Sequence, residues 1–250
     1  MKIELQRKWI HTGNLILVNA DYSYDEQVNE MDLVNIGTQN NKTLLERRPA
    51  VLLSEIMGKI NGWGKISAVS GWRSMQEQKK IYTQSLKENG SEFTQKYVAL
   101  PGHSEHQTGL AIDLALTSDN IDFIRPDFPY AGICQTFRNL AIQYGFIERY
   151  PSKKQSVTGI AHEPWHFRYI GVPHAETMKK NDLCLEEYVQ FIKQFIYGER
   201  KYNCEAAQKN FFISYLPASR SEITGVEIDK DISYTISGNN IDGYIITEWR

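Results

Sequence analysis

The chain has 250 residues, of which 41% are hydrophobic and 23% are charged, and its formal net charge at pH 7 is −2. This length suits one large domain or a core domain with an appendage, and the composition is that of an ordinary globular protein. A charge balance so close to neutral excludes functions that depend on a strongly basic surface, so we expect neither a nucleic-acid partner nor a membrane-surface protein.

The beginning of the chain carries no apolar run that could serve as a signal peptide. Its best apolar stretch, residues 15–18, is far shorter than the ~20 residues that a membrane span needs. The cysteines Cys134, Cys184 and Cys204 are odd in number and widely spaced, which is typical of small buried hydrophobes in a reducing compartment. We therefore expect a cytoplasmic protein with no membrane span.

Hydrophobic periodicity, interrupted by turn residues, predicts a series of short strands and helices. In chain order we expect a strand at 14–18, a helix at 43–60 that stops at Asn61-Gly62, a strand at 66–69, a helix at 75–88, a buried strand at 110–116, a helix at 132–144 that stops at Gly145, a strand at 166–170 after a Pro164-Trp165 turn, and a helix at 182–197. This order has no regular β-α alternation. It favours an α+β fold with a small mixed or antiparallel sheet and flanking helices.

The composition changes after Gly198. Residues 211–215 and 244–247 form strand-like runs, and Gly, Asn, Asp and Ser residues lie between them. Residue types that are typical of catalysis do not cluster in this region. We therefore expect a catalytic domain at 1–198 and a C-terminal β-rich appendage at 199–250 that packs on it.

The residues that carry chemistry gather in two segments, and four of them suit a metal site. His106, Asp113 and His166 supply two imidazoles and one carboxylate. A catalytic zinc ion typically takes three such protein ligands and leaves its fourth position open. Glu163 then remains to take a proton from the attacking water. The sequence therefore predicts a Zn²⁺ site with a general base beside it.

Local sequence supports this assignment. Asp113 lies inside an apolar run, where an unpaired charge is costly and a bound metal removes the cost. Pro164 excludes a regular helix between Glu163 and His166, so we expect this pair on a tight turn. Taken alone, each histidine has a simpler interpretation as a core or surface residue, and the Glu-x-x-His spacing is a weak signal. The conjunction of the two segments is what favours a metal site.

Three motifs follow one another along the chain, namely Gly71-Trp72-Arg73-Ser74-x-x-x-Gln78, Ser104-x-His106-x-x-Gly109-x-Ala111-x-Asp113 and Glu163-x-Trp165-His166. Their combination resembles the zinc D-Ala-D-Ala peptidases of the VanX/VanY type, over about residues 65–175. The resemblance is closest to the soluble bifunctional VanXY members, which are both D,D-dipeptidases and D,D-carboxypeptidases. It implies a fold of the Hedgehog/D,D-peptidase type, with the β-rich region after residue 200 outside it.

The resemblance also implies a role for each matching residue. His106, Asp113 and His166 match the zinc ligands, Glu163 matches the general base, and Arg73 matches the arginine that stabilises the oxyanion. Gln78, Ser104 and Tyr150 lie where related enzymes bind the terminal D-residue of the substrate and its carboxylate. The simpler alternatives are a surface salt bridge for Arg73 and a core aromatic position for Tyr150.

The implied function is zinc-dependent hydrolysis of the D-Ala-D-Ala dipeptide and of the terminal D-Ala of peptidoglycan pentapeptide precursors, as in vancomycin-type resistance. The alternatives are a strict D,D-carboxypeptidase, a wall-lytic endopeptidase and a zinc-stabilised binding module without turnover. A binding module could lose the base or the arginine, whereas Glu163 and Arg73 are both present. We expect small peptides ending in D-Ala-D-Ala as partners, and the sequence does not decide between a monomer and a homodimer.

The segment at 150–162 leads directly into Glu163, is polar and has no apolar periodicity. It predicts a mobile loop that passes the metal site, and the alternative is an idle surface connection. A pocket that serves both a dipeptide and a longer precursor needs a movable wall, which favours a role for this loop in substrate selection.

Overall fold

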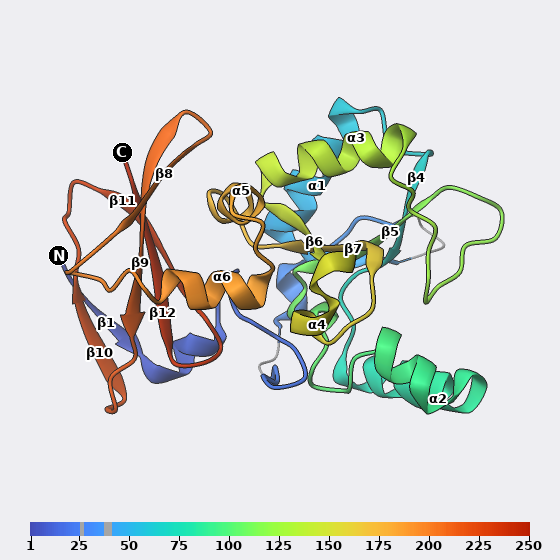
Figure 1. Ribbon diagram of the computed structural model, residues 1–250, viewed down its shortest axis with the longest axis horizontal. Coiled ribbons are helices and arrows are strands. Elements are labelled where there is room, and N and C mark those ends of the chain that lie inside the picture. The colour runs from blue at the N-terminus through green and yellow to red at the C-terminus, as the bar shows by residue number, and fades with distance from the viewer. Residues whose placement is uncertain (26–27, 38–41) are drawn as a thin grey trace. The chain divides into compact units, whose positions relative to one another are not determined.

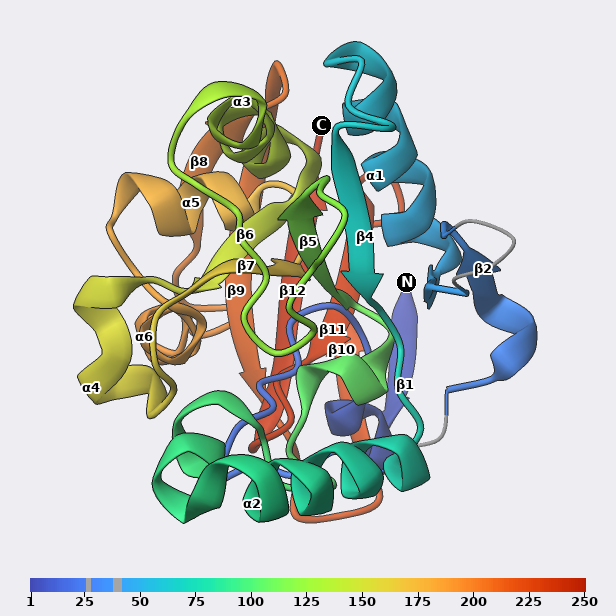
Figure 2. The same cartoon turned by 90° about the vertical axis from the view of Figure 1, so that its right-hand side faces the viewer.

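The computed structural model describes residues 1–25, 28–37 and 42–250, which form two compact units. One unit comprises residues 18–171, and the other combines residues 1–17 with residues 172–250. Figure 1 labels their helices and strands, and Figure 2 shows the same elements from the side. None of the described helices is long and apolar enough to cross a lipid bilayer.

The unit at 18–171 is built on a four-stranded antiparallel sheet in the order β4-β5-β7-β6. Its strands are β4 (Ile66–Ser70), β5 (Ala111–Leu116), β6 (Phe146–Tyr150) and β7 (Glu163–Tyr169). Its helices are α1 (Arg47–Lys59), α2 (Met75–Tyr97), α3 (Gly132–Ala141) and α4 (Gln155–Thr158), and β2 (Leu33–Asn35) pairs with β3 (Leu44–Glu46). The predicted α+β fold with a small sheet and flanking helices is confirmed.

One face of this sheet forms the hydrophobic core of the unit. Because side chains alternate along a strand, Ile112 and Leu114 of β5 share a face, as do Trp165 and Phe167 of β7. All four belong to one buried cluster with apolar residues of α1 and α3. In Figure 1, α1 and α3 lie together on one side of the sheet, and α2 lies on the other.

The residues between these core positions face the opposite side of the sheet. Asp113 of β5 and His166 and Arg168 of β7 are buried polar residues of this kind. Asp113 pairs directly with His166 across the two strands. The packing of α1 and α3 against one face therefore places the polar side chains of two neighbouring strands together on the other.

Local signals explain where helices begin and end. Ser74 and Glu77 form a capping box, in which each side chain accepts a hydrogen bond from the backbone amide of the other, and this fixes the start of α2. The helix continues beyond the predicted end at residue 88, and Gly90 interrupts it with a φ of 80°. Gly145, with a φ of 84°, ends the helical segment that follows α3, as predicted.

The other unit is rich in strands. β1 (Lys2–Gln6) pairs with β10 (Ile223–Glu227), and a four-stranded sheet has the order β11-β12-β9-β8. Its strands are β8 (Tyr202–Ala206), β9 (Lys209–Pro217), β11 (Ser233–Gly238) and β12 (Gly243–Trp249), and its helices are α5 (His174–Lys180) and α6 (Leu185–Ile192). The predicted β-rich character of the C-terminal region is confirmed, whereas the helix predicted at 182–197 is shorter.

Two predicted elements near the N-terminus differ from the structure. The strand predicted at 14–18 is wrong, because its backbone is held by other groups: the Leu15 amide donates to Ser237 Oγ, and the Leu17 amide donates to the Asn239 carbonyl. The apolar residues at 15–18 are buried, but they do not pair with another strand in a sheet. The helix predicted at 43–60 begins only with α1, because the preceding residues pair with β2 as β3.

The chain divides into its two units after residues 17 and 171, whereas we expected a single boundary after residue 198. The pairing of β1 with β10 joins the N-terminus to the C-terminal region. His174 Nε2 of α5 lies 3.1 Å from Thr247 Oγ1 of β12, which joins α5 to the same unit. Residues 172–198 therefore belong with the β-rich unit, because their partners come from distant parts of the sequence.

Candidate active site

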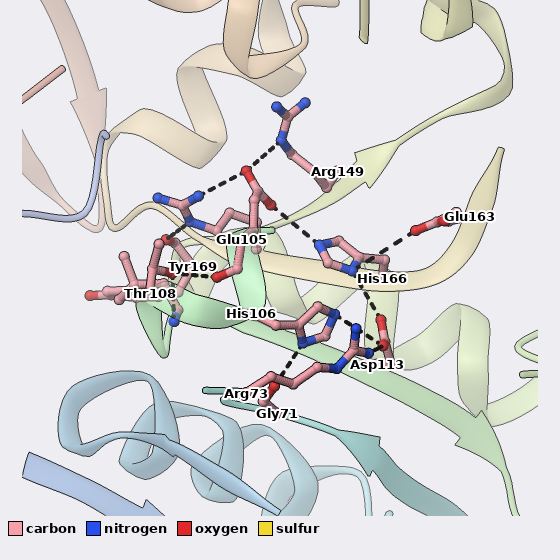
Figure 3. Close-up of polar contacts among 12 residues, drawn as sticks. Gly71, Arg73, Glu105, His106, Thr108, Asp113, Arg149, Glu163, His166 and Tyr169 are labelled. Atoms are coloured by element: carbon pink, nitrogen blue, oxygen red, sulfur yellow. Dashed lines mark hydrogen bonds and ion pairs between the residues drawn. The ribbon is translucent and has the colours of Figure 1, made fainter. Parts of the chain in front are cut away.

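The three residues expected to bind a metal lie together in the unit at 18–171 (Figure 3). His106 comes from a 3₁₀ turn, Glu105–Thr108, whereas Asp113 comes from β5 and His166 from β7. One ligand atom of each lies within 4.8 Å of the others, and all three residues are buried. Asp113 Oδ2 lies 3.1 Å from His106 Nε2, and Asp113 Oδ1 lies 2.9 Å from His166 Nδ1.

The chemistry of this donor set fits a zinc ion. Two imidazole nitrogens and one carboxylate oxygen are donors that catalytic zinc sites use. His106 Nδ1 lies 2.7 Å from the Gly71 carbonyl and must donate to it, which leaves Nε2 of the neutral ring as the ligand atom. His166 Nε2 lies 3.2 Å from a Glu105 oxygen, so that Nδ1 is the corresponding ligand atom. Both ligand nitrogens therefore lie beside Asp113.

Burial and neighbouring charges determine the protonation of these ligands. Burial lowers the pKa of His106 to about 4, so its ring is neutral at pH 7, as metal binding requires. Burial raises the pKa of Asp113, but His106 and His166 outweigh it and hold that pKa well below its usual value. Burial lowers the pKa of His166, but hydrogen bonds to Asp113 and Glu105 outweigh it and raise the pKa to about 9. Metal binding at His166 Nδ1 would therefore release a proton.

Glu163 supplies a further carboxylate beside the ligands. Its Oε2 lies 3.9 Å from His166 Nδ1, and the residue is buried. Burial raises the pKa of Glu163 to about 8, and the nearby His166 opposes this rise. A cation at the ligand atoms would bring this raised pKa of Glu163 down toward neutrality. A carboxyl group with a pKa near neutral can both accept and return a proton at physiological pH.

Glu163 and His166 reach the same site through an irregular strand. We expected a tight turn at Pro164, and this expectation is wrong because all three residues belong to β7. In a regular strand, side chains three positions apart point to opposite faces. Here the pairing of β7 with β6 shifts between the positions opposite Glu148 and Tyr150. Such irregularities turn a side chain from its regular direction, and this one accompanies the approach of Glu163 to His166.

Arg73 lies at the edge of the same site. Its Nη2 lies 3.0 Å from Asp113 Oδ2, and its Nε donates to Ser70 Oγ at 2.8 Å. Gln78 is fully buried: it accepts a hydrogen bond from Arg73 Nη1 at 3.3 Å and donates to the Ala99 carbonyl at 2.8 Å. Gln78 is not among the described residues that line the pocket, and its contact on the side of the site is with Arg73.

A pocket opens beside the candidate ligands and combines polar with apolar groups. Ser104 and Tyr150, both expected to contact the substrate, line it together with Arg73 and Glu163. The centres of the Tyr150 and His166 rings lie 5.0 Å apart. The apolar part of the wall includes Ile81, Tyr97, Phe123, Ile124 and Ile160. The pocket therefore places apolar and polar side chains together next to the candidate ligands.

Sequence reasoning missed Glu105, which lies between two residues that it singled out. The side chain of Glu105 is fully buried and contacts Arg149, Arg168 and His166. A signal was present, because Arg149 and Arg168 stand inside strand-like runs, and a buried arginine needs an acidic partner. Which acid provides the partner depends on the tertiary structure.

Several known proteins resemble this chain. Residues 53–172 match the family model VanY, described as D-alanyl-D-alanine carboxypeptidase. Over 132 residues the chain is 46% identical to VanXYC from Enterococcus gallinarum, a bifunctional D-Ala-D-Ala dipeptidase and D-Ala-D-Ala carboxypeptidase, and the match covers 52% of this chain and 70% of that protein.

Solved structures resemble it as well. The vancomycin resistance D,D-dipeptidase VanXYg, in complex with a D-Ala-D-Ala phosphinate analog, has a TM-score of 0.95 at 49% identity, covering 100% of this chain and 99% of that one. A mutant of the D,D-pentapeptidase VanY from a VanB-type resistance cassette, in complex with Zn(II), has a TM-score of 0.57 at 27% identity, covering 70% of this chain and 98% of that one.

Proposed function

Because this chain belongs to the VanY family of D-alanyl-D-alanine carboxypeptidases, we propose that it is a zinc-dependent peptidase with two activities. It hydrolyses the D-Ala-D-Ala dipeptide, and it removes the terminal D-Ala from peptidoglycan pentapeptide precursors, as in vancomycin-type resistance. The observation that carries this proposal is the convergence of His106, Asp113 and His166, with Glu163 beside them. The relative VanXYC has both activities, which supports the proposal that this chain acts on both substrates.

His106, Asp113 and His166 would hold Zn²⁺, which when bound supplies a Lewis acid for the peptide carbonyl and for the attacking water. The Zn(II) complex of the VanY relative supports this choice of metal. Glu163 takes the proton from the attacking water and then delivers it to the leaving nitrogen of D-alanine. Its raised pKa suits a group that accepts a proton in one step and releases it in the next.

Arg73 stabilises the negative charge that develops on the carbonyl oxygen. Arg73 lines the pocket, and Ser70, Gln78 and Asp113 hold its guanidinium in place before the substrate binds. A charge that is fixed in advance needs no reorganisation during the reaction, which makes it effective. Gln78 therefore acts through Arg73.

Ser104 and Tyr150 line the pocket and are our candidates for contacts with the terminal D-residue of the substrate. The residues proposed for catalysis and binding all lie in the unit at 18–171, which we propose is the peptidase. We also propose that the enzyme acts in the cytoplasm, and its three free cysteines suit a reducing compartment.

Release of D-alanine tests the proposed function. The purified protein is incubated with zinc and with either D-Ala-D-Ala or a pentapeptide ending in D-Ala-D-Ala. We expect D-alanine from both substrates and loss of both activities after treatment with a chelator. Release from the pentapeptide alone would indicate a strict D,D-carboxypeptidase, and release from neither substrate would favour a binding module.

A further inference from the structure

Glu105 is a carboxylate that lies against His166 on the side of the ring away from Asp113 (Figure 3). Its Oε2 lies 3.2 Å from His166 Nε2. Its Oε1 accepts hydrogen bonds from Arg149 Nε and from Arg168 Nη1, each at 2.8 Å. The side chains of Glu105, Arg149 and Arg168 are all 0% exposed. One carboxylate thus joins a candidate metal ligand to two buried arginines.

The two arginines explain how Glu105 remains charged in the interior. A buried carboxylate is tolerated where charged hydrogen-bond partners offset its lost hydration. Arg149 extends from β6 and Arg168 from β7, so two neighbouring strands fix one oxygen of Glu105. The other oxygen is thereby held toward His166, where it contacts the ring edge opposite the ligand atom.

This arrangement determines which nitrogen of His166 keeps its proton when the ring is neutral, as metal binding requires. An ionised carboxylate only accepts hydrogen bonds, so His166 Nε2 must donate to Glu105. The lone pair of the neutral ring then lies on Nδ1, which is 2.9 Å from Asp113 Oδ1 and 3.9 Å from Glu163 Oε2. Carboxylates that accept from the second nitrogen of a metal-binding histidine fix its orientation and raise its basicity.

We propose that Glu105, held by Arg149 and Arg168, is a positioning residue that sets the tautomer and direction of His166 and so strengthens zinc binding. This inference rests on the zinc site proposed above. It assigns the buried arginines a role in metal affinity, because they fix the carboxylate that orients the ligand. A merely structural ion cluster would stabilise the fold without a direct effect on the metal.

The variant Glu105→Gln tests the inference with little change in shape. If the amide oxygen keeps the arginine contacts, the amide nitrogen faces His166 Nε2 as a donor, and the ring proton must move to Nδ1, where it blocks the metal. We expect the zinc dissociation constant, measured by competition with a chromophoric chelator, to rise by about 10- to 100-fold. The absorption spectrum of the Co²⁺-loaded protein should change as well, because the geometry at His166 changes.

A matched control is Glu148→Gln on β6. Glu148 also accepts a hydrogen bond from a buried arginine, Arg138, at 2.9 Å, but it contacts none of the three candidate ligands through the described hydrogen bonds and ion pairs. We expect this variant to bind zinc as tightly as the wild type. Glu105→Asp is a second test, because it keeps the negative charge for the arginines but withdraws the oxygen from His166 by about 1.5 Å, one carbon–carbon bond. We expect it to fold and to bind zinc more weakly than the wild type.

The outcomes separate this inference from the proposed function. A wild-type protein that binds no zinc would contradict the proposed function and the inference together. The role of Glu105 alone would be overturned by another result. In it, the wild type binds zinc and releases D-alanine, and a folded Glu105→Asp or Glu105→Gln variant binds zinc as tightly as the wild type. Weaker binding in the Glu105 variants, with unchanged binding in Glu148→Gln, would support it.

Discussion

Glu163 is a buried carboxylate beside a candidate metal ligand, and this position makes its function testable by a single substitution. Glu163→Gln keeps the shape of the side chain but removes the base. We expect zinc content to remain at the wild-type level and kcat to fall by at least ~10²-fold, the low end for a general acid–base residue. Metal analysis and D-alanine release on the same sample measure both. A nearly normal rate would assign the base to another group.

His174 makes a second prediction at this scale, in the β-rich unit. It is buried, its Nδ1 lies 2.6 Å from the Tyr188 hydroxyl, and burial lowers its pKa to about 3. The unfolded chain has a higher histidine pKa, near 6.5, and therefore binds the proton first as the pH falls. The contribution of His174 to stability is present above about pH 6.5 and decreases toward pH 3, with a slope of up to ~1.4 kcal/mol per pH unit.

Hydrogen exchange of β12, corrected for the intrinsic rate, measures this effect in the unit that contains His174. The wild type should lose protection below pH 6.5 more steeply than His174→Gln, whose side chain does not titrate. Parallel pH profiles for the two proteins would show that His174 is not the responsible group.

At the residue scale, the sequence motifs named residues that the structure brings close together. The geometry of His106, Asp113 and His166 agrees with the predicted ligand set, and Arg73 lies beside them. Gln78 and Glu105 show why the rest could not be predicted. Both are buried, and the atoms that they contact come from segments whose approach depends on tertiary packing.

Among the elements, the turn from α3 into β6 is a tightly packed connection. Gly145 has a φ of +84°, and a Cβ atom added there would lie 2.6 Å from the Gly171 Cα. Gly159 has a similar φ of +72° but has no heavy atom within 4 Å of an added Cβ. A left-handed non-glycine residue costs about 1–2 kcal/mol by itself, and overpacking adds about 1–3 kcal/mol.

We therefore expect Gly145→Ala to lower the free energy of unfolding by clearly more than Gly159→Ala, as measured by urea denaturation. The comparison isolates the contact with Gly171, because both positions have a positive φ. Equal losses in the two variants would mean that the contact relaxes without cost.

The segment before Glu163 makes a prediction about substrate range. We expect a mobile loop here, and within it residues 152–154 form a 3₁₀ turn and residues 155–158 form α4. Ile160 lines the pocket, which places the end of this segment at the site. Lys153 and Lys154 would repel the ammonium group of a dipeptide more than a longer precursor.

We expect that shortening residues 152–158 changes the ratio of kcat/KM for dipeptide and pentapeptide by ~10-fold or more, about 1.4 kcal/mol of differential transition-state binding. Zinc content should stay the same, which is the internal control. If both substrates lose activity equally, the segment supports the site without selecting between substrates.

Element prediction succeeded where the hydrophobic period was clear and failed where pairing partners decide. The apolar run that became β5 and the helical stripe that became α3 were predicted near their observed bounds. The turn expected at Pro164 is part of a strand, because β7 lies between β5 and β6 and the proline stands near its first residue. Periodicity alone does not show whether a neighbouring strand is available.

At the scale of the whole molecule, the division into units was the least predictable feature. The change in composition after residue 198 corresponds to an observed feature, because the C-terminal strands begin with β8 at Tyr202. However, β1 pairs with β10 over more than two hundred positions of sequence, and local patterns carry no information on such a pairing. The three candidate metal ligands all lie in the unit at 18–171, so their assignment does not depend on where the boundary between the units falls.

The most direct measurement is zinc content together with D-alanine release for the wild type, His106→Ala and His166→Ala. His103→Ala is the matched control, since His103 Nδ1 lies 2.7 Å from the Asn19 carbonyl and the residue does not belong to the metal cluster found among the described residues. We predict that the wild type and the His103 variant bind zinc and release D-alanine, and that both ligand variants lose zinc and turnover together, because removing one of three ligands undermines the site. If His106→Ala and His166→Ala both keep their zinc and their turnover, the metal site is not where we place it.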